Sequence, residues 1–178
     1  MDHTMRTFIT ILFVVLAVSV SAGTIENQNA VFEGEIAPSV NGYFANGKGA
    51  SAFFLVGEQY AEGYVSFGRS ETIGSVFVAA EAGLGVEQTP SGFGRMLAAS
   101  VFAKFGNVSF LGVAERGSGM WYKFHIKWNV VPQVSLGILA KRHSGIGPRL
   151  DIRIPHTPLT VWGALQNRSG IIAVNSTF

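Results

Sequence analysis

A histidine beside a serine is the first combination in this sequence that could do chemistry. His143 and Ser144 lie in the segment KRHSGIG, and Asp151 follows further along the chain. A hydrolase triad needs a serine nucleophile, a histidine base and an orienting carboxylate whose side chains converge. Neighbouring residues on a strand point to opposite faces, and in a glycine-rich turn such residues are more often simply solvated. We therefore predict a turn here and no enzyme activity, with an envelope lipid hydrolase as an alternative.

Charged residues form a second pattern, because acidic groups lie early in the chain and basic groups late. Opposite signs on facing walls of a narrow interior can pair, whereas like charges crowded together would repel. Two interpretations stay open: a salt-bridged core that rigidifies a closed barrel, or a polarised narrow pore or lumenal binding site. The predicted charge network comprises Glu33, Glu35, Glu62, Glu81, Glu115, Lys123, His125, Lys127, Lys141, Arg149, Asp151 and Arg153.

Metal, cofactor and nucleic-acid chemistry have little support. The chain has no cysteine, and neither metal-ligand spacing nor a phosphate-binding glycine loop occurs. His125 lies between two lysines, and His156 lies in a proline-bounded turn without an evident partner. The net charge of +2 is too small to indicate nucleic-acid binding. We predict no metal, no cofactor and no nucleic-acid partner.

The stretch from Gly119 to Val130, GMWYKFHIKWNV, shows which element must position these groups. Its even positions are all apolar or aromatic, and its odd positions are mostly polar or cationic. Successive side chains of a strand point to opposite faces, so a period of two places the lysines and His125 on one face. A helix would spread them around its circumference. This stretch is predicted to be a strand.

Similar short alternating runs fill the chain from Val31 onward, and no helical period interrupts them. Eleven runs are separated by turn signals, and Asn46-Gly47-Lys48-Gly49 is a strong one. Dividing the run 31–44 at Pro38 gives twelve strands, and merging 50–69 gives ten. Residues 23–30 are interpreted as a polar lead-in. Many short strands at this spacing indicate one all-β domain, a single antiparallel up-and-down barrel.

The first residues have the features of a secretory signal. Arg6 provides a positive charge, Phe8 to Val18 form an apolar run, and Val20-Ser21-Ala22 offers small residues for cleavage after Ala22. The apolar run is shorter than the ~20 residues that a spanning helix needs. We predict a signal peptide over 1–22 and a barrel domain over 23–178.

Three features favour a barrel inside a membrane over a soluble one. Charged residues make up only 13% of the chain, against roughly 25% in typical soluble domains. The runs are near the ~9–11 residues that cross a bilayer with tilt. Aromatic residues also gather near the ends of runs, as in interfacial girdles: Tyr43, Phe44, Tyr60, Phe93, Trp121, Trp128 and Trp162.

The last alternating run ends in Phe178, with Ile172 and Val174 on the same face. Here the sequence resembles the small outer-membrane β-barrels of Gram-negative bacteria, the OmpA- and OmpX-like class, whose assembly signal is a final strand ending in an aromatic residue. This chain has Ser176 where that class prefers a hydrophobic residue. The resemblance implies a transmembrane β-barrel with an even strand number between 8 and 12, located in the bacterial outer membrane.

The resemblance also implies two partners, outer-membrane lipid and the barrel-assembly machinery. The expected function is a structural or narrow-pore, porin-like role in the cell envelope. The alternative from another class is a secreted, soluble ligand-binding barrel of lipocalin type, in which the apolar faces would line a cavity.

Overall fold

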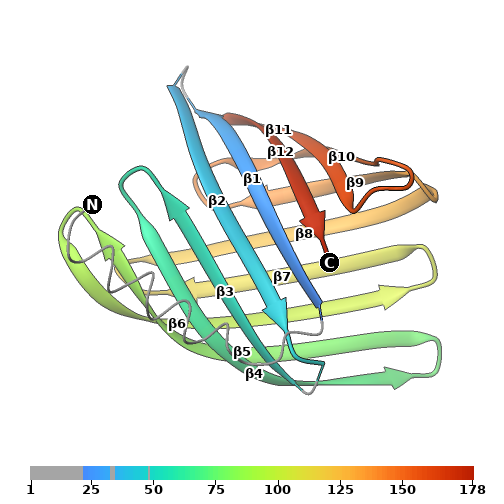
Figure 1. Cartoon of the computed structure of the whole chain (residues 1–178), viewed down its shortest axis with the longest axis horizontal. Helices are drawn as coiled ribbons and strands as arrows, with labels where there is room; N and C mark the ends of the chain where they lie inside the picture. The colour runs from blue at the N-terminus through green and yellow to red at the C-terminus, as the bar shows by residue number, and fades with distance from the viewer. Residues whose placement is uncertain (1–21, 33–34, 48) are drawn as a thin grey trace.

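The computed structural model describes residues 22–32, 35–47 and 49–178. Twelve antiparallel strands close into one barrel in which each strand pairs with its sequence neighbours and β1 pairs with β12. Figure 1 shows the strands in chain order around the barrel. They are β1 (Ala22–Phe32), β2 (Glu35–Ala45), β3 (Ala50–Gly57), β4 (Ala61–Ile73), β5 (Val76–Thr89), β6 (Gly92–Phe105), β7 (Val108–Arg116), β8 (Met120–Val131), β9 (Val134–Lys141), β10 (Gly145–Arg153), β11 (Leu159–Gln166) and β12 (Ser169–Thr177). The predicted fold class and even strand number are confirmed.

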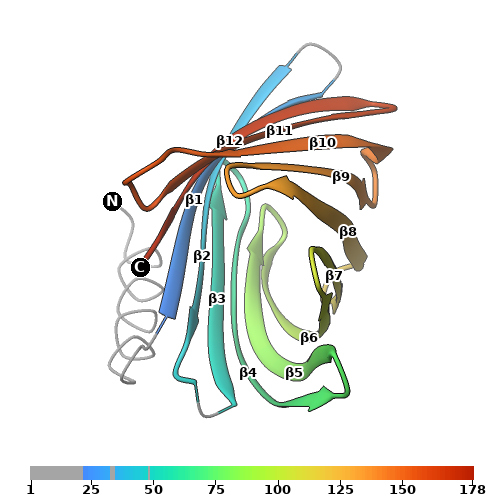
Figure 2. The same cartoon turned by 90° about the vertical axis from the view of Figure 1, so that its right-hand side faces the viewer.

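The barrel has two ends, the Ala22 end and the Tyr60 end. The Ala22 end is where β1 begins and β12 ends, and the Tyr60 end carries the turn between β3 and β4. In Figure 2, β9 to β12 form one wall and β4 to β6 lie opposite, with β1 to β3 joining them on one side. No helix among the described residues is long and apolar enough to cross a membrane.

Alternation along the strands separates an apolar outer face from a more polar interior. On β8 the even positions are exposed and the odd positions from Trp121 to Lys127 are shielded, as the sequence predicts. Outward aliphatic and aromatic side chains cover every wall, although bulk water would not favour so much exposed apolar surface. Those more than half exposed include Phe67, Leu84, Leu97, Ile138, Leu165 and Ile172. This outer face suits a surrounding of lipid.

The segment interpreted as a polar lead-in is instead strand β1, and that interpretation is wrong. Its inward positions are polar, with Glu26 and Gln28 buried. Its outward positions include Asn27 and Asn29, which pair in register with Val174 and Ile172 of β12. Because polar residues occupy both faces, the alternation of apolar and polar side chains is lost, although the backbone pairs along its whole length.

Pro38 does not divide a strand, because it lies inside β2. There β2 pairs with β1, whereas its pairing with β3 starts only at Ser39. Proline lacks a backbone N–H and is tolerated where one side of a strand is unpaired. The unpaired side of residues 35–38 explains how the proline fits.

The predicted aromatic girdle is only partly outside. Phe93 and Trp128 are exposed on the outer face. Phe44 packs outside between Phe54 and Phe178, with ring centroids 6.1 Å from each. The remaining members turn inward or into a turn: Tyr43, Tyr60, Trp121 and Trp162 contact lumenal groups or line a cavity.

The barrel closes where the start of β1 meets the last residue. Gly23 and Phe178 exchange two backbone hydrogen bonds of 2.9 and 3.0 Å. The Phe178 ring covers Gly23 so closely that a Cβ there would lie 2.8 Å from it, so a larger residue at this position would have to displace the ring. The predicted signal peptide falls almost wholly outside the described residues.

Candidate functional site in the barrel lumen

An ion cluster on β8 and β10 lies inside the late wall of the barrel. The Arg149 guanidinium donates two hydrogen bonds to the Asp151 carboxylate, at 2.8 and 2.7 Å. Lys127 Nζ lies 3.6 Å from the same carboxylate. Arg149 and Asp151 are both about 5% exposed or less. Two cations therefore share one anion, which leaves a net positive charge on this wall.

Trp162 of β11 joins this cluster to the first strand. The Arg149 guanidinium lies 3.8 Å from the centroid of the Trp162 ring, a cation–π contact. The indole N–H donates to Glu26 Oε2 at 2.6 Å, and Asn41 donates to the other carboxylate oxygen at 3.1 Å. A cluster of apolar side chains packs around Trp162 inside the barrel: Leu139, Ala164, Ile171, Ala173 and Ala30. The lumen is thus narrowed by packed side chains.

Acidic residues gather on the opposite wall, near the Tyr60 end. Glu62 and Glu87 stand directly opposite each other on β4 and β5. The Tyr60 hydroxyl lies 2.6 Å from Glu62 Oε2 and 3.2 Å from Glu87 Oε2. A hydroxyl has one hydrogen and can donate to only one of these carboxylates at a time. Burial and the neighbouring Glu62 raise the pKa of the Tyr60 phenol, so it stays a donor at neutral pH.

Glu87 also binds the turn between β7 and β8. Its carboxylate accepts a hydrogen bond from the backbone N–H of Ser118. A Cβ at Gly117 would lie 2.5 Å from the same carboxylate, so glycine allows the turn to approach this closely. Two turns of the Tyr60 end therefore meet at one carboxylate.

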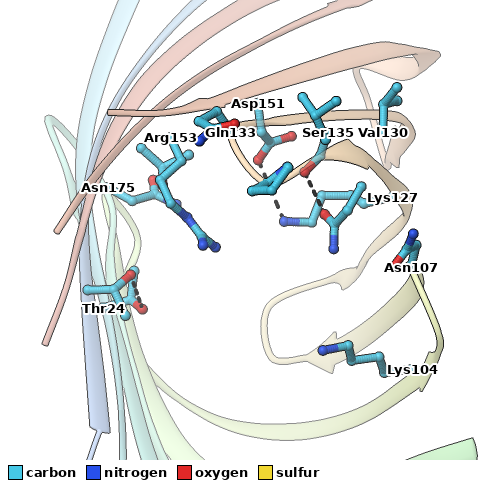
Figure 3. Close-up of a pocket in the computed structure, with 15 residues that line it drawn as sticks. Thr24, Lys104, Asn107, Lys127, Val130, Gln133, Ser135, Asp151, Arg153 and Asn175 are labelled. Atoms are coloured by element: carbon cyan, nitrogen blue, oxygen red, sulfur yellow. Dashed lines mark hydrogen bonds and ion pairs between the residues drawn. The ribbon is translucent and has the colours of Figure 1, made fainter. Parts of the chain in front are cut away.

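A polar cavity of about 630 Å³ opens at the Ala22 end (Figure 3). Turn residues such as Asn107 and Gln133 line it, so it forms part of the mouth of the lumen. In Figure 3, Lys104 and Arg153 extend into the space from different sides. Neither forms an ion pair within the part of the chain that the structure describes. Together with Lys127, they make this mouth electropositive.

A second cavity of about 580 Å³ opens at the same end along the early wall, and Thr24 borders both. Its lining is mainly aromatic and aliphatic, with Glu81 and Glu115 among the polar residues. Glu81 accepts hydrogen bonds from Ser51 at 2.7 Å and Tyr43 at 3.1 Å. The mouth thus has a basic half and an aromatic, acidic half.

The structure places the predicted charge network in several locations. Glu33 falls outside the described residues, and Glu35 is exposed at the rim. Arg153 lines the basic mouth. The others occupy inward positions on β4, β5 and β7 to β10: Glu62, Glu81, Glu115, Lys123, His125, Lys127, Lys141, Arg149 and Asp151. Within the described residues, ion pairs join only Asp151 to Arg149 and Lys127, so no early glutamate is paired within 4.0 Å with a late base.

The hydrolase candidates do not converge. His143 is an exposed turn residue with a positive φ of 73°. Asp151 lies six positions along β10 from Gly145, roughly 20 Å at the usual rise of a strand, and its carboxylate is bound by Arg149. No group of three or more His, Cys, Asp or Glu residues suited to a metal occurs in the described ranges.

Sequence reasoning missed Glu26, Glu87 and Tyr60. Glu26 belongs to the strand whose alternation is obscured by Asn27 and Asn29. The sequence predicts an alternating run that begins at Ile73 and ends at Leu84, so Glu87 lies beyond it. Val86 and Glu87 nevertheless continue the apolar and polar alternation toward the end of β5 at Thr89. Extending that run by its own period would have found it. Tyr60 was predicted only as an interfacial aromatic residue, and nothing in the sequence indicated its contact with the two glutamates.

Comparison with solved structures identifies the architecture. The KdgM porin matches with a TM-score of 0.59 and 11% identity, over 87% of this chain and 98% of its own. This chain has the fold of a porin. The NanC porin matches with a TM-score of 0.59 and 10% identity, over 85% of this chain and 98% of its own.

The KdgM porin in complex with disordered oligogalacturonate matches with a TM-score of 0.58 and 10% identity, over 88% and 98% of the two chains. No protein-family model matches this chain, and no curated protein does. These neighbours share the fold of this chain. The narrower resemblance to the OmpA- and OmpX-like class stays a prediction.

Proposed function

We propose that this chain is a narrow pore of the bacterial outer membrane. The observation that carries the proposal is the closed twelve-stranded barrel with an apolar outer face and an electropositive mouth. An apolar exterior suits lipid, and a polar, charged lumen suits the passage of water and small ions. The predicted signal peptide over 1–22 and insertion by the barrel-assembly machinery belong to the same proposal.

The basic half of the mouth, the polar cavity at the Ala22 end, favours anions because its fixed charges are mostly positive. Lys104, Lys127 and Arg153 line the cavity at the Ala22 end, and Asp151 is the one carboxylate among its lining residues. Asp151 is already bound by Arg149 and Lys127. Rings or clusters of lysine and arginine lower the barrier for anions and raise it for cations in narrow pores. The oligogalacturonate in the KdgM complex is consistent with this preference.

The early glutamates and late bases are proposed to act on each other across the lumen without direct ion pairs. Lys123 lines the same cavity as Glu115 and Glu26. Such attraction is stronger in a poorly solvated interior than in water at the same distance. This would hold the two walls together while leaving room between them.

A purely structural barrel and an envelope hydrolase remain as outcomes of the test. We propose no enzyme activity, because His143 and Ser144 lie in an exposed turn away from Asp151. Lipid A or phospholipid turnover by the refolded protein, lost in Ser144→Ala with folding intact, would overturn that part of the proposal.

Conductance of the refolded chain in planar bilayers tests the pore directly. Under a KCl gradient we expect discrete channels with a reversal potential on the anion-selective side. The pair Lys104→Gln and Arg153→Gln should move that potential toward zero. Arg95→Gln on β6 is the matched control, since Arg95 is exposed on the outer face. Absence of channels, or cation selectivity in the parent, would contradict the proposal.

A further inference from the structure

The cavity along the early wall is lined by two aromatic pairs and a tryptophan. Phe53 stacks on Tyr64 with ring centroids 4.9 Å apart, and Phe77 meets Phe102 edge to face at 6.1 Å. Trp121 contributes from β8. Packed rings of this kind are held in fixed orientations and offer electron-rich faces to a bound group. The volume of about 580 Å³ is in the range of small-molecule sites.

Glu81 supplies a carboxylate that is oriented but not neutralised. Each of its oxygens accepts one hydrogen bond, from the hydroxyl of Tyr43 and from that of Ser51. Both donors are neutral, and Glu81 forms no ion pair in the part of the chain that the structure describes. A negative charge held by neutral donors at an aromatic cavity is what a cationic ligand requires.

The basic residues of the same cavity do not cancel this charge. Lys123 forms no ion pair with Glu81 in the described residues. Arg69 is exposed at the rim of the cavity. His125 presents a buried Nδ1 with no hydrogen-bond partner, an unusual condition for a polar atom away from water. That nitrogen is a second polar group available to a ligand.

We propose that this cavity binds a small organic cation with an apolar or aromatic body, such as a quaternary ammonium or an arylalkylamine. The cationic group would lie beside Glu81 and against the rings of Phe53 and Tyr64. The apolar body would fill the space toward Phe77 and Phe102. Aromatic faces attract ammonium groups by cation–π interaction, and the carboxylate adds charge pairing. The site does not depend on conductance, because it is also complete in a barrel whose lumen is closed.

Calorimetric titration of the refolded full chain in detergent micelles tests the site with benzyltrimethylammonium as the probe. We expect saturable binding that weakens by about tenfold or more in Glu81→Gln, because a hydrogen-bonded charged partner is lost. Phe53→Leu keeps an apolar side chain but removes the ring face, and it should weaken binding by about threefold to tenfold. Glu71→Gln is the matched control, since Glu71 is exposed on β4 at the same end, and it should leave affinity unchanged.

Benzoate, which has the same phenyl ring as benzyltrimethylammonium but the opposite charge, is the second probe. Tighter binding of benzoate than of benzyltrimethylammonium would show that Lys123 and His125 govern the cavity, and it would overturn the proposal. So would equal affinities in the parent and Glu81→Gln, or no saturable binding by the parent. Heat-modifiable migration of each variant on a gel confirms that the barrel has folded before its affinity is compared.

Discussion

The indole N–H of Trp162 lies 2.6 Å from a carboxylate oxygen of Glu26, although 136 positions separate the two residues in the chain. The bond crosses the closing seam, from β11 past β12 to β1. Asn175 Oδ1 lies 3.2 Å from the same indole nitrogen. Glu26→Ala removes the nearer acceptor of the indole and the acceptor of Asn41, so we expect the free energy of unfolding to fall by about 1–3 kcal/mol. Glu26→Gln keeps one acceptor oxygen and should cost less.

Urea unfolding in lipid vesicles measures this loss. Glu35→Ala is the control, because Glu35 is exposed at the rim of β2 and its removal should change stability by less than about 0.5 kcal/mol. Equal losses for Glu26→Ala and Glu35→Ala would mean that the seam does not depend on this bond.

Asp151 holds two cations, and its removal should be costly. Asp151→Asn leaves Arg149 and Lys127 in the lumen without their carboxylate, and we expect a loss of about 3–5 kcal/mol in unfolding free energy. Replacing Arg149 by Met in the same variant removes one of the stranded charges and should restore part of the loss. A double variant less stable than Asp151→Asn alone would show that Arg149 has another essential contact, of which the Trp162 ring is the candidate.

The Tyr60 hydroxyl lies within hydrogen-bonding distance of Glu62 and Glu87, two carboxylates that face each other on neighbouring strands. Tyr60→Phe removes the bridging hydroxyl and leaves Glu62 and Glu87 opposed, and like charges directly opposite on a sheet are destabilising. We expect Glu87→Gln to lower the free energy of unfolding far less in the Tyr60→Phe background than in the parent, or even to raise it. A double-mutant cycle on unfolding free energies should give a coupling of about 0.5–3 kcal/mol. A coupling near zero would mean that the bridge contributes nothing.

The fold was largely predictable because apolar and polar residues alternate in the sequence of most strands. Met120–Val131 shows this best, since every even position from Met120 to Val130 is exposed and apolar. The first strand escaped detection because Asn27 and Asn29 face outward, where a lipid-facing strand is expected to be apolar. Local pattern cannot reveal a strand whose identity depends on the partners it pairs with at both edges.

The site was less predictable, because its contacts depend on barrel geometry. The alternation of side-chain directions along a strand predicted that Lys127 and Asp151 face the lumen. It could not show that Asp151 binds Arg149 on its own strand. The predicted pairing of early glutamates with late bases assumed that facing walls touch. In the described residues, the bases Arg149 and Lys127 instead pair with a carboxylate of their own wall, Asp151.

The two faces of β8 should respond differently to substitution. Phe124 is exposed on the outer face, and an arginine near the bilayer midplane of a barrel costs about 2–4 kcal/mol. Phe124→Arg should therefore lower the yield of folded barrel in vesicles much more than Lys123→Ser. Folded and unfolded fractions separate by heat-modifiable migration. Normal assembly of Phe124→Arg together with failure of Lys123→Ser would mean that the faces are inverted.

The most direct test of a barrel with its apolar face in the membrane is to measure which tryptophans contact lipid. Trp128 is exposed on the outer face of β8, whereas Trp121 lines the lumenal cavity and Trp162 is buried. Three variants that each keep one tryptophan, refolded into vesicles with brominated acyl chains, report contact with lipid by quenching of fluorescence. We predict strong quenching of Trp128 and little of Trp121 or Trp162. Quenching of Trp121 with Trp128 unaffected, or no quenching of any of the three, would contradict a barrel with its apolar face in the membrane.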